Sequence, residues 1–254
     1  MGYPKDYIEL NDSRDYPVLR RVLRSGFVTH SQLFRFMEIA GSESSRQSFN
    51  WRVSRLVEHG LILRLPLPNF GRDFVYSIAA VGAQRLFGQG EYALCGKKKR
   101  DGYDRDTNVV HSLELNRIHL SLLEKYPQAR WTPSGQIRSQ NELTEFGYAK
   151  DYDAIIEAQP DDRDLRFALE YERTPKAQKR YEGIATGLSK EKRIGHLVYL
   201  AANSDLLSYV YKYFASIQHP VYFGRVNDWH RLVLDTPVVA NCFTVALPLR
   251  QALK

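Results

Sequence analysis

Cysteine is nearly absent from this sequence, and its scarcity excludes several classes of protein. The 254 residues include two cysteines, Cys95 and Cys242, which lie far apart and match no metal-ligand spacing. A disulfide-stapled secreted module and a cysteine-ligated zinc site are therefore excluded. We interpret both cysteines as structural and expect a reducing, cytoplasmic location.

Long hydrophobic runs are also absent. No segment approaches the roughly 18 consecutive apolar residues of a membrane-spanning helix. Residues 1–6 have no apolar core of a signal peptide, and Asp6 stands where a myristoylation signal has Ser or Thr. We therefore expect no membrane partner, and the sequence leaves the oligomeric state open.

What the sequence does contain is an ordinary globular composition with an excess of positive charge. Hydrophobic residues make up 43% and charged residues 26%, as in a soluble protein with room for two modest domains. Lys and Arg number 36 against 29 Asp and Glu, and the net charge is +7. Because clustered cations bind phosphates and release counterions, this excess favours a polyanionic partner.

Helical and strand patterns succeed one another in residues 1–87. Apolar spacing predicts a first helix over residues 14–24. Thr29 with Gln32 forms a capping box for a second helix, and Ser42 is expected to cap a third.

Two strands, at residues 61–65 and 74–78, are expected to follow as a hairpin joined by residues 66–72. Three helices and a hairpin are typical of a winged helix-turn-helix domain.

The third helix is expected to read DNA. Phe49, Val53, Leu56 and Val57 would face inward, and the outward set is expected to include Arg46, Gln47, Asn50, Arg52 and Arg55. Arg pairs with guanine edges and Asn or Gln with adenine, while Arg72 in the wing would reach backbone phosphate. Double-stranded DNA is therefore the expected partner; a protein-interaction module is the alternative.

Residues 88–107 lose periodicity and are expected to be a basic linker. The segment carries the run Lys97, Lys98, Lys99 and Arg100. The run is interpreted either as a strap that contacts phosphates or as a solvated basic loop.

A helix is expected to open the second domain, residues 108–254, and to run to about Tyr126. His111 and Glu114 share a predicted apolar face with leucine and isoleucine side chains. Buried ionisable groups are costly unless paired or metal-bound, so both are candidates for a site. The alternative is a satisfied core histidine beside a half-exposed glutamate.

Carboxylates alternate on the two strands expected at residues 151–156 and 165–172. Asp151 and Asp153 would share one side of the first strand, and Glu170 and Glu172 one side of the second. Four gathered carboxylates repel one another unless a cation neutralises them, and oxygen ligands suit Mg²⁺ or Mn²⁺.

Thr174 and Pro175 then predict the start of a helix that bears Lys176, Lys179 and Arg180. A cation beside a metal-bound water suits phosphodiester cleavage. Further strands (194–201, 221–225, 238–247) and a helix (205–217) complete an α/β architecture.

The order of these motifs resembles known nucleases. Tyr152-Asp153 stands in the place of the Pro-Asp of the PD-(D/E)xK, or restriction-endonuclease-like, fold, and Glu170-Tyr171-Glu172 matches its Glu-x-Lys with Glu at the lysine position. Over nearly its whole length the chain resembles more closely the replication-relaxation family and the MOBC-type plasmid mobilisation relaxases. This likeness rests also on the strand 76–78 with Gly82 and Leu86, on residues 111–116, and on Arg173.

The resemblance implies a DNA-binding relaxase or endonuclease of a mobile element that nicks one strand at an origin of transfer during conjugation. It implies that Asp153, Glu170 and Glu172 hold Mg²⁺ or Mn²⁺, with Glu114 as a further ligand or an orienting group. It further implies that His111 and Asn116 position water or phosphate and that Lys176 or Lys179 replaces the missing lysine. Single-stranded DNA at the nick and accessory mobilisation proteins would be further partners.

Two alternatives stay open. In the first, the nuclease-like domain is inactive and the protein regulates transcription or replication by binding DNA; Glu172 in the lysine position favours this reading. In the second, the protein is a small-molecule or protein-interaction module.

Overall fold

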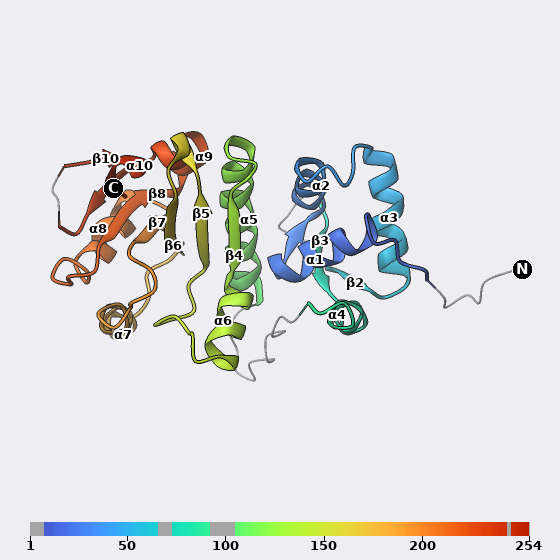
Figure 1. The fold of residues 1–254 in the computed structure, drawn as a ribbon, viewed down its shortest axis with the longest axis horizontal. Helices are drawn as coiled ribbons and strands as arrows, with labels where there is room; N and C mark the ends of the chain where they lie inside the picture. Colours follow the sequence, from blue (N-terminus) through green and yellow to red (C-terminus); the bar gives the residue numbers. More distant parts are fainter. Residues whose placement is uncertain (1–7, 66–72, 92–104, 243–244, 254) are drawn as a thin grey trace, which may run out of the picture. The chain divides into compact units, whose positions relative to one another are not determined.

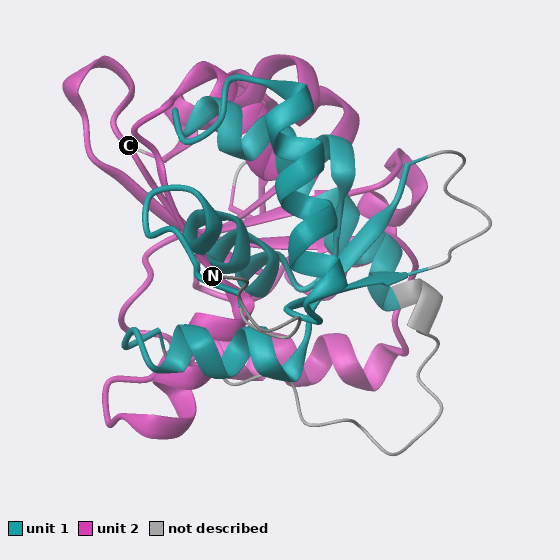
Figure 2. Cartoon of the chain, turned by 90° about the vertical axis from the view of Figure 1, so that its right-hand side faces the viewer, with its two compact units in different colours: residues 1–116 teal, residues 117–254 magenta. Residues whose placement is uncertain are grey.

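The computed structural model describes residues 8–65, 73–91, 105–242 and 245–253. The chain is a mixed α/β protein that divides into two compact units, residues 1–116 and 117–254 (Figure 2). The division falls inside the long helix α5 (Arg105–Lys125). Arg72 and the run Lys97, Lys98, Lys99 and Arg100 lie outside the described residues. Within the described ranges, no helix is both long and apolar enough to cross a membrane.

The first three helices and the two hairpin strands of unit 1 lie close to their predicted positions, whereas the strand Val28–Thr29 and the helix Ala80–Phe87 were not predicted. In order along the described chain they are α1 (Asp15–Ser25), β1 (Val28–Thr29), α2 (His30–Ile39), α3 (Arg46–Glu58), β2 (Ile62–Leu65), β3 (Val75–Ile78) and α4 (Ala80–Phe87) (Figure 1). The strands described here form one sheet in the order β1-β3-β2, with antiparallel pairing throughout. Phe49 and Leu56 of α3 are completely buried, as predicted.

The helix caps of unit 1 confirm one prediction and correct another. The Gln32 amide donates to Thr29 Oγ1 at 3.1 Å, and the Thr29 amide donates to Gln32 Oε1 at 3.2 Å, so the capping box exists. Ser42 does not cap α3, because its hydroxyl donates back to the Met37 carbonyl. Ser45 takes that role by accepting a hydrogen bond from the Ser48 amide at 3.3 Å. The third helix therefore begins later than predicted.

Gly82 brings α4 against the end of α3 and the start of β2. The Leu61 carbonyl accepts a hydrogen bond from the Ala79 amide at 3.1 Å. A Cβ atom on Gly82 would lie 2.1 Å from that same carbonyl oxygen and 2.9 Å from Ile78 Cδ1. Only glycine allows this approach of the two backbones.

We expect Gly82→Ala to destabilise unit 1 by about 1–3 kcal/mol, because α4 must shift away from the Leu61 carbonyl. Urea unfolding followed by circular dichroism measures the change. Gly183→Ala on α7 (Gln178–Leu188) is the matched control: no atom outside the helix lies within 4 Å of its added Cβ, so helix propensity alone should stabilise the fold by roughly 0.5–1 kcal/mol. If Gly82→Ala were as stable as the unaltered chain, the contact between the backbones at Gly82 and Leu61 would not require glycine.

Unit 2 is built on a mixed sheet. Among its described residues the strands follow the order β10-β9-β8-β7-β6-β5-β4. The pairs β6–β7 and β7–β8 are parallel, and the remaining pairs are antiparallel. The strands are β4 (Arg130–Pro133), β5 (Ala154–Ala158), β6 (Leu165–Glu172), β7 (Leu197–Ala201), β8 (Val221–Arg225), β9 (Pro237–Ala240) and β10 (Leu247–Pro248).

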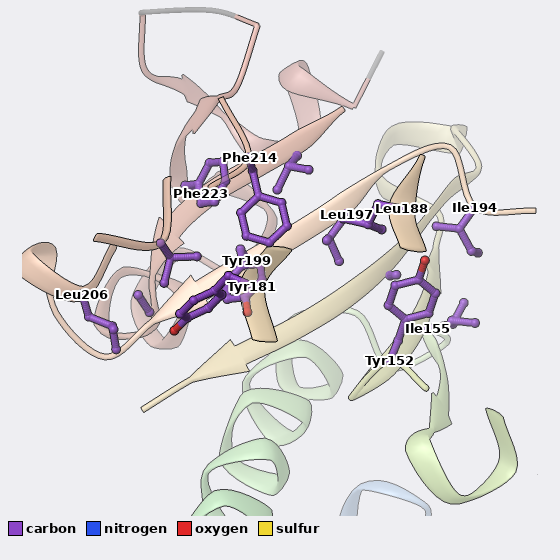
Figure 3. Close-up of a cluster of buried hydrophobic side chains, with 14 of the residues drawn as sticks. Tyr152, Ile155, Tyr181, Leu188, Ile194, Leu197, Tyr199, Leu206, Phe214 and Phe223 are labelled. Carbon is purple, nitrogen blue, oxygen red and sulfur yellow. The ribbon is translucent and has the colours of Figure 1, made fainter. Parts of the chain in front are cut away.

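Helices cover both faces of this sheet. They are the last turns of α5, α6 (Ser134–Leu143), α7 (Gln178–Leu188), α8 (Ser204–Tyr211), α9 (Val226–Leu232) and α10 (Leu249–Ala252). On one face, α6, α7 and α8 pack on strand side chains that include Tyr199 and Phe223 (Figure 3). In α9, the buried Trp229 indole donates to the Ile118 carbonyl of α5 at 3.0 Å.

Several predicted boundaries in unit 2 were wrong. The strand predicted from residue 151 begins only at Ala154, because the Asp151 carboxylate accepts a hydrogen bond from Asn141 Nδ2 at 2.7 Å instead. The helix predicted at Thr174 and Pro175 begins at Gln178, after a turn in which the Lys176 amide donates to the Tyr181 hydroxyl. The strand predicted over 238–247 is two separate strands, β9 and β10.

Candidate functional site

Unit 1 has a polar hollow beside α3. Its volume is about 520 Å³, and it is lined by residues of α2, α3 and the strands β2 and β3 together with the residues just before β3. The lining side chains are His30, Ser31, Arg46, Asn50, Val53, Ser54, Arg64, Asp73, Phe74 and Tyr76.

Three of the predicted DNA-reading residues are exposed on α3. Arg46, Gln47 and Asn50 all face solvent, and Arg46 and Asn50 line the hollow. The Arg46 guanidinium lies 4.8 Å from the centre of the Phe34 ring. On β2, Arg64 lies over the Phe74 ring and adds a second guanidinium to the same hollow.

Arg52 was wrongly predicted to point outward. Its side chain is 6% exposed; Nη1 donates to Asp15 Oδ1 at 3.0 Å and Nη2 to Glu43 Oε2 at 3.1 Å. Arg55 is half-buried and pairs with the other oxygen of Asp15. Burial alone would raise the pKa of the Asp15 carboxyl, but the Asn11 amide and the Arg55 and Arg52 guanidinium groups hold this pKa below its ordinary value. Both arginines therefore stabilise unit 1.

A hydrogen-bonded chain crosses the floor of the hollow. His30 Nδ1 lies 3.0 Å from the Tyr76 hydroxyl, and His30 Nε2 lies 2.8 Å from Asn50 Oδ1. Burial lowers the pKa of His30, against the opposing effect of the Asn50 hydrogen bond, and the nearby Arg46 lowers it further. The sequence did not reveal this chain, because its three members lie on different elements and match no motif.

The predicted site residues of α5 lie in unit 1. His111 and Glu114 are half-buried, whereas Val109 and Leu113 are buried against Leu65. Asn116 is buried, and its Nδ2 donates to the Phe27 carbonyl at 2.7 Å. The amide of Asn116 is therefore used for packing within unit 1.

Three predicted carboxylates lie at neighbouring backbone positions of two paired chain segments in unit 2. Asp153 directly precedes β5, and the register of β5 on β6 pairs Ala154 with Leu169, which places Asp153 opposite Glu170. The Asp153 carboxylate accepts a hydrogen bond from the Tyr171 amide at 2.8 Å. Glu170 and Glu172 are each 4% exposed and alternate along β6. The prediction that Asp151 joins them was wrong, because Asp151 is exposed and bound to Asn141.

Two lysines pair with two of the three carboxylates of this cluster. Lys150 Nζ lies 2.6 Å from Glu170 Oε1, and Lys176 Nζ lies 2.6 Å from Glu172 Oε2. The Tyr199 hydroxyl also donates to Glu172 Oε2, at 3.1 Å. Of the two lysines considered as replacements for the motif lysine, Lys176 reaches the cluster, while Lys179 is exposed on α7. Lys150 was missed, since it lies in a loop outside any predicted motif.

Burial dominates the electrostatics of the cluster. It raises the pKa of Glu170, and the attraction of Lys150 only partly opposes this effect; Asp153 raises the pKa further. Burial and the charges of Glu170 and Glu172 likewise raise the pKa of the Tyr199 hydroxyl. Glu170 therefore keeps its proton to a higher pH than an ordinary glutamate does.

The residue types of the cluster fit a divalent cation. Three carboxylates provide the all-oxygen ligand set that Mg²⁺ and Mn²⁺ prefer. Glu170 Oε1 is buried and touches the Lys150 ammonium group, but accepts no well-directed hydrogen bond. Among the described residues, however, no three His, Cys, Asp or Glu side chains are arranged to hold a metal ion. In this arrangement the lysines supply the balancing charge.

The chain matches no family model, and no curated protein matches it.

Proposed function

We propose that this chain binds double-stranded DNA through a winged helix formed by unit 1 and nicks one strand through a PD-(D/E)xK-like unit 2. The observation that carries the proposal is the exposed edge of α3, where Arg46 and Asn50 line the hollow and Gln47 is also exposed. A helix of this kind fits the major groove, and these residue types pair with base edges. Arg64 on the neighbouring strand provides a cation for backbone phosphate.

In unit 2 the proposal assigns Asp153, Glu170 and Glu172 as ligands of Mg²⁺ or Mn²⁺. The cation would supply a nucleophilic water and neutralise charge on the phosphate. Lys176 takes the place of the motif lysine, since its ammonium group already contacts Glu172. Its positive charge would stabilise the negative charge that develops on the phosphate oxygens.

This combination is the one expected of a replication-relaxation or MOBC-type mobilisation relaxase. We accordingly propose a cytoplasmic protein of a mobile element that acts at an origin of transfer. Single-stranded DNA at the nick and accessory mobilisation proteins would be its further partners. His111 and Glu114 have no role in this proposal.

A second candidate function is a DNA-binding regulator with an inactive nuclease-like unit. One observation favours it: Lys150 and Lys176 already pair with Glu170 and Glu172, so two of the three carboxylates have a cationic partner without a metal ion. In that case the exposed edge of α3 would still bind DNA, and unit 2 would serve as a scaffold.

A plasmid assay separates the two functions. Supercoiled plasmid that carries the presumed native origin is incubated with the protein in Mg²⁺, Mn²⁺ or EDTA. Relaxed circles that form with metal and not with EDTA are expected for the nickase. Retarded but uncut plasmid under all three conditions would establish the regulator in its place.

Arg46→Ala should weaken binding to the preferred duplex by about 1–3 kcal/mol if Arg46 pairs with a base edge. Fluorescence anisotropy with labelled duplexes at one fixed salt concentration measures the affinity, because phosphate contacts depend on salt. Arg130→Ala on unit 2 removes the same charge from a side chain that is 83% exposed, and it is the control. A reading role for Arg46 would be contradicted if Arg46→Ala and Arg130→Ala bound the preferred duplex equally well and the scrambled duplex equally well.

A further inference from the structure

We propose that the hollow beside α3 selects guanine over adenine through Asn50, whose amide His30 holds in one orientation. The proposal rests on the DNA binding proposed above and assigns the base that this surface recognises. His30 is a positioning residue in this arrangement, and Asn50 is the residue that touches the base.

The hydrogen-bonded chain determines which atoms of Asn50 face outward. Asn50 Oδ1 is an acceptor, so His30 Nε2 must carry the proton of the bond between them. A neutral imidazole then has an acceptor at Nδ1, and the Tyr76 hydroxyl donates to it. Every member of the chain has its partner in this single pattern, which leaves the Nδ2 amino group of Asn50 as a donor toward the DNA.

The surroundings stabilise this pattern. The His30 ring packs 5.0 Å from the Phe49 ring and 5.8 Å from the Tyr76 ring, centre to centre, which limits its rotation. Burial lowers its pKa, as does Arg46, so the ring is neutral near pH 7. The Ser31 amide donates to Asp73, which keeps that carboxylate at the start of α2.

The donor pattern of Asn50 decides between the purines. Asparagine usually pairs with adenine by accepting from N6 and donating to N7. Here Oδ1 already accepts from His30 Nε2 with one of its two lone pairs, so the N6 amino group of adenine would have to share this acceptor with His30. Guanine offers two acceptors, O6 and N7, at the same edge, and both suit an amino donor. Arg46 and Arg64 in the same hollow also favour acceptor-rich guanine.

The first test is independent of DNA. Long-range ¹H–¹⁵N spectra of the full chain report which imidazole nitrogen of His30 carries the proton, and a His30→Gln variant identifies the signals. The Nε2–H form is expected. A dominant Nδ1–H form would overturn the inference and leave the proposed DNA binding untouched.

The second test is selection from random duplexes. The unaltered chain should prefer guanine over adenine at one position by roughly tenfold. His30→Leu releases the Asn50 amide, so this preference should fall to about twofold or less. His30→Gln retains a donor close to the Nε2 position and should keep most of the preference. Circular dichroism of each variant verifies the fold.

The outcomes are distinguishable. A preference that is the same in the unaltered chain and in His30→Leu overturns the role of His30 while the DNA-binding function stands. If the unaltered chain binds no duplex, both the proposed function and the base assignment fail, whatever the imidazole spectra show.

Discussion

Replacing Arg52 by methionine is expected to cost unit 1 about 3–5 kcal/mol of folding free energy. The guanidinium group of Arg52 links two carboxylates that are almost fully buried, Asp15 at 0% and Glu43 at 7% side-chain exposure. Methionine preserves most of the volume but none of the charge. The two carboxylates would then remain in the interior with an uncompensated negative charge, which is far costlier than the loss of an exposed pair.

Urea unfolding at pH 7 measures this loss. Arg35→Met is the control, because Arg35 and Glu38 are 45% and 41% exposed and their pair should contribute less than about 1 kcal/mol. If Arg52→Met were as stable as Arg35→Met, the buried ion pairs of Arg52 would contribute no more to folding than the exposed pair of Arg35.

The same ion pairs predict how unit 1 responds to acid. The pKa of Asp15 is held below its ordinary value of 3.8. The stability that this carboxylate contributes is therefore complete above that ordinary value and is lost as the pH falls through the lower pKa of the folded state. In Arg52→Met the loss on acidification should be smaller, since one of the groups that lower the pKa is gone.

Glu170→Gln should reduce metal-dependent nicking by at least about 100-fold. Loss of residues that only support metal ligands already costs 10- to 100-fold in many sites, and Glu170 is assigned as a ligand itself. Glutamine has the same shape but binds a divalent cation poorly. The plasmid assay in Mn²⁺ gives the rates, and Asp151→Asn removes a charge two residues from Asp153, outside the cluster, as the control.

Glu170→Gln should also stabilise unit 2 relative to the unaltered chain, and this gain should grow as the pH rises. The pKa of Glu170 is raised above its ordinary value of 4.5, mainly by burial. The wild-type chain is thus most stable while Glu170 is protonated, and it loses that stability as the pH rises through the raised pKa. Glutamine does not ionise, and Lys150 keeps a second contact with the Tyr152 ring at 5.4 Å.

Thermal unfolding at pH 5 and pH 8 tests this second effect. The advantage of Glu170→Gln should be larger at pH 8, with about 2–4 °C in Tm for each kcal/mol gained. In the plasmid assay, a nicking rate of Glu170→Gln equal to that of the unaltered chain would show that Glu170 is not a metal ligand. A lower Tm than the wild type at pH 8 would show that the pair with Lys150 outweighs the burial of the charge.

Local signals in the sequence were enough to locate most elements of unit 1. The Thr29–Gln32 capping box and the apolar spacing of α3 act over a few residues, so they were predicted. The burial of Arg52 was not predicted, because the helical spacing that buries Phe49 and Val53 gives no information about carboxylates on other elements. Asp15 lies 37 residues away in the sequence and nonetheless removes Arg52 from the surface.

The alternation of side chains along β6 was likewise a local property, and it put Glu170 and Glu172 on one side of the strand. Whether those charges attract a cation or pair with lysines depends on loops that no periodicity describes. Lys150 and Lys176 arrive from the two chain segments that flank the cluster, and only the packed structure brings them within 2.6 Å of its oxygens.

The sequence by itself determined the basic charge, the α/β order of elements and the placement of Glu170 and Glu172 on one side of a strand, because these depend on composition and short-range periodicity. Tertiary structure alone decided which ionisable groups meet. It buried Arg52 between two acids, set lysines against Glu170 and Glu172, and linked His30 to Asn50 and Tyr76. Such pairings depend on long-range packing, since a buried charge is stable only where another element supplies its partner.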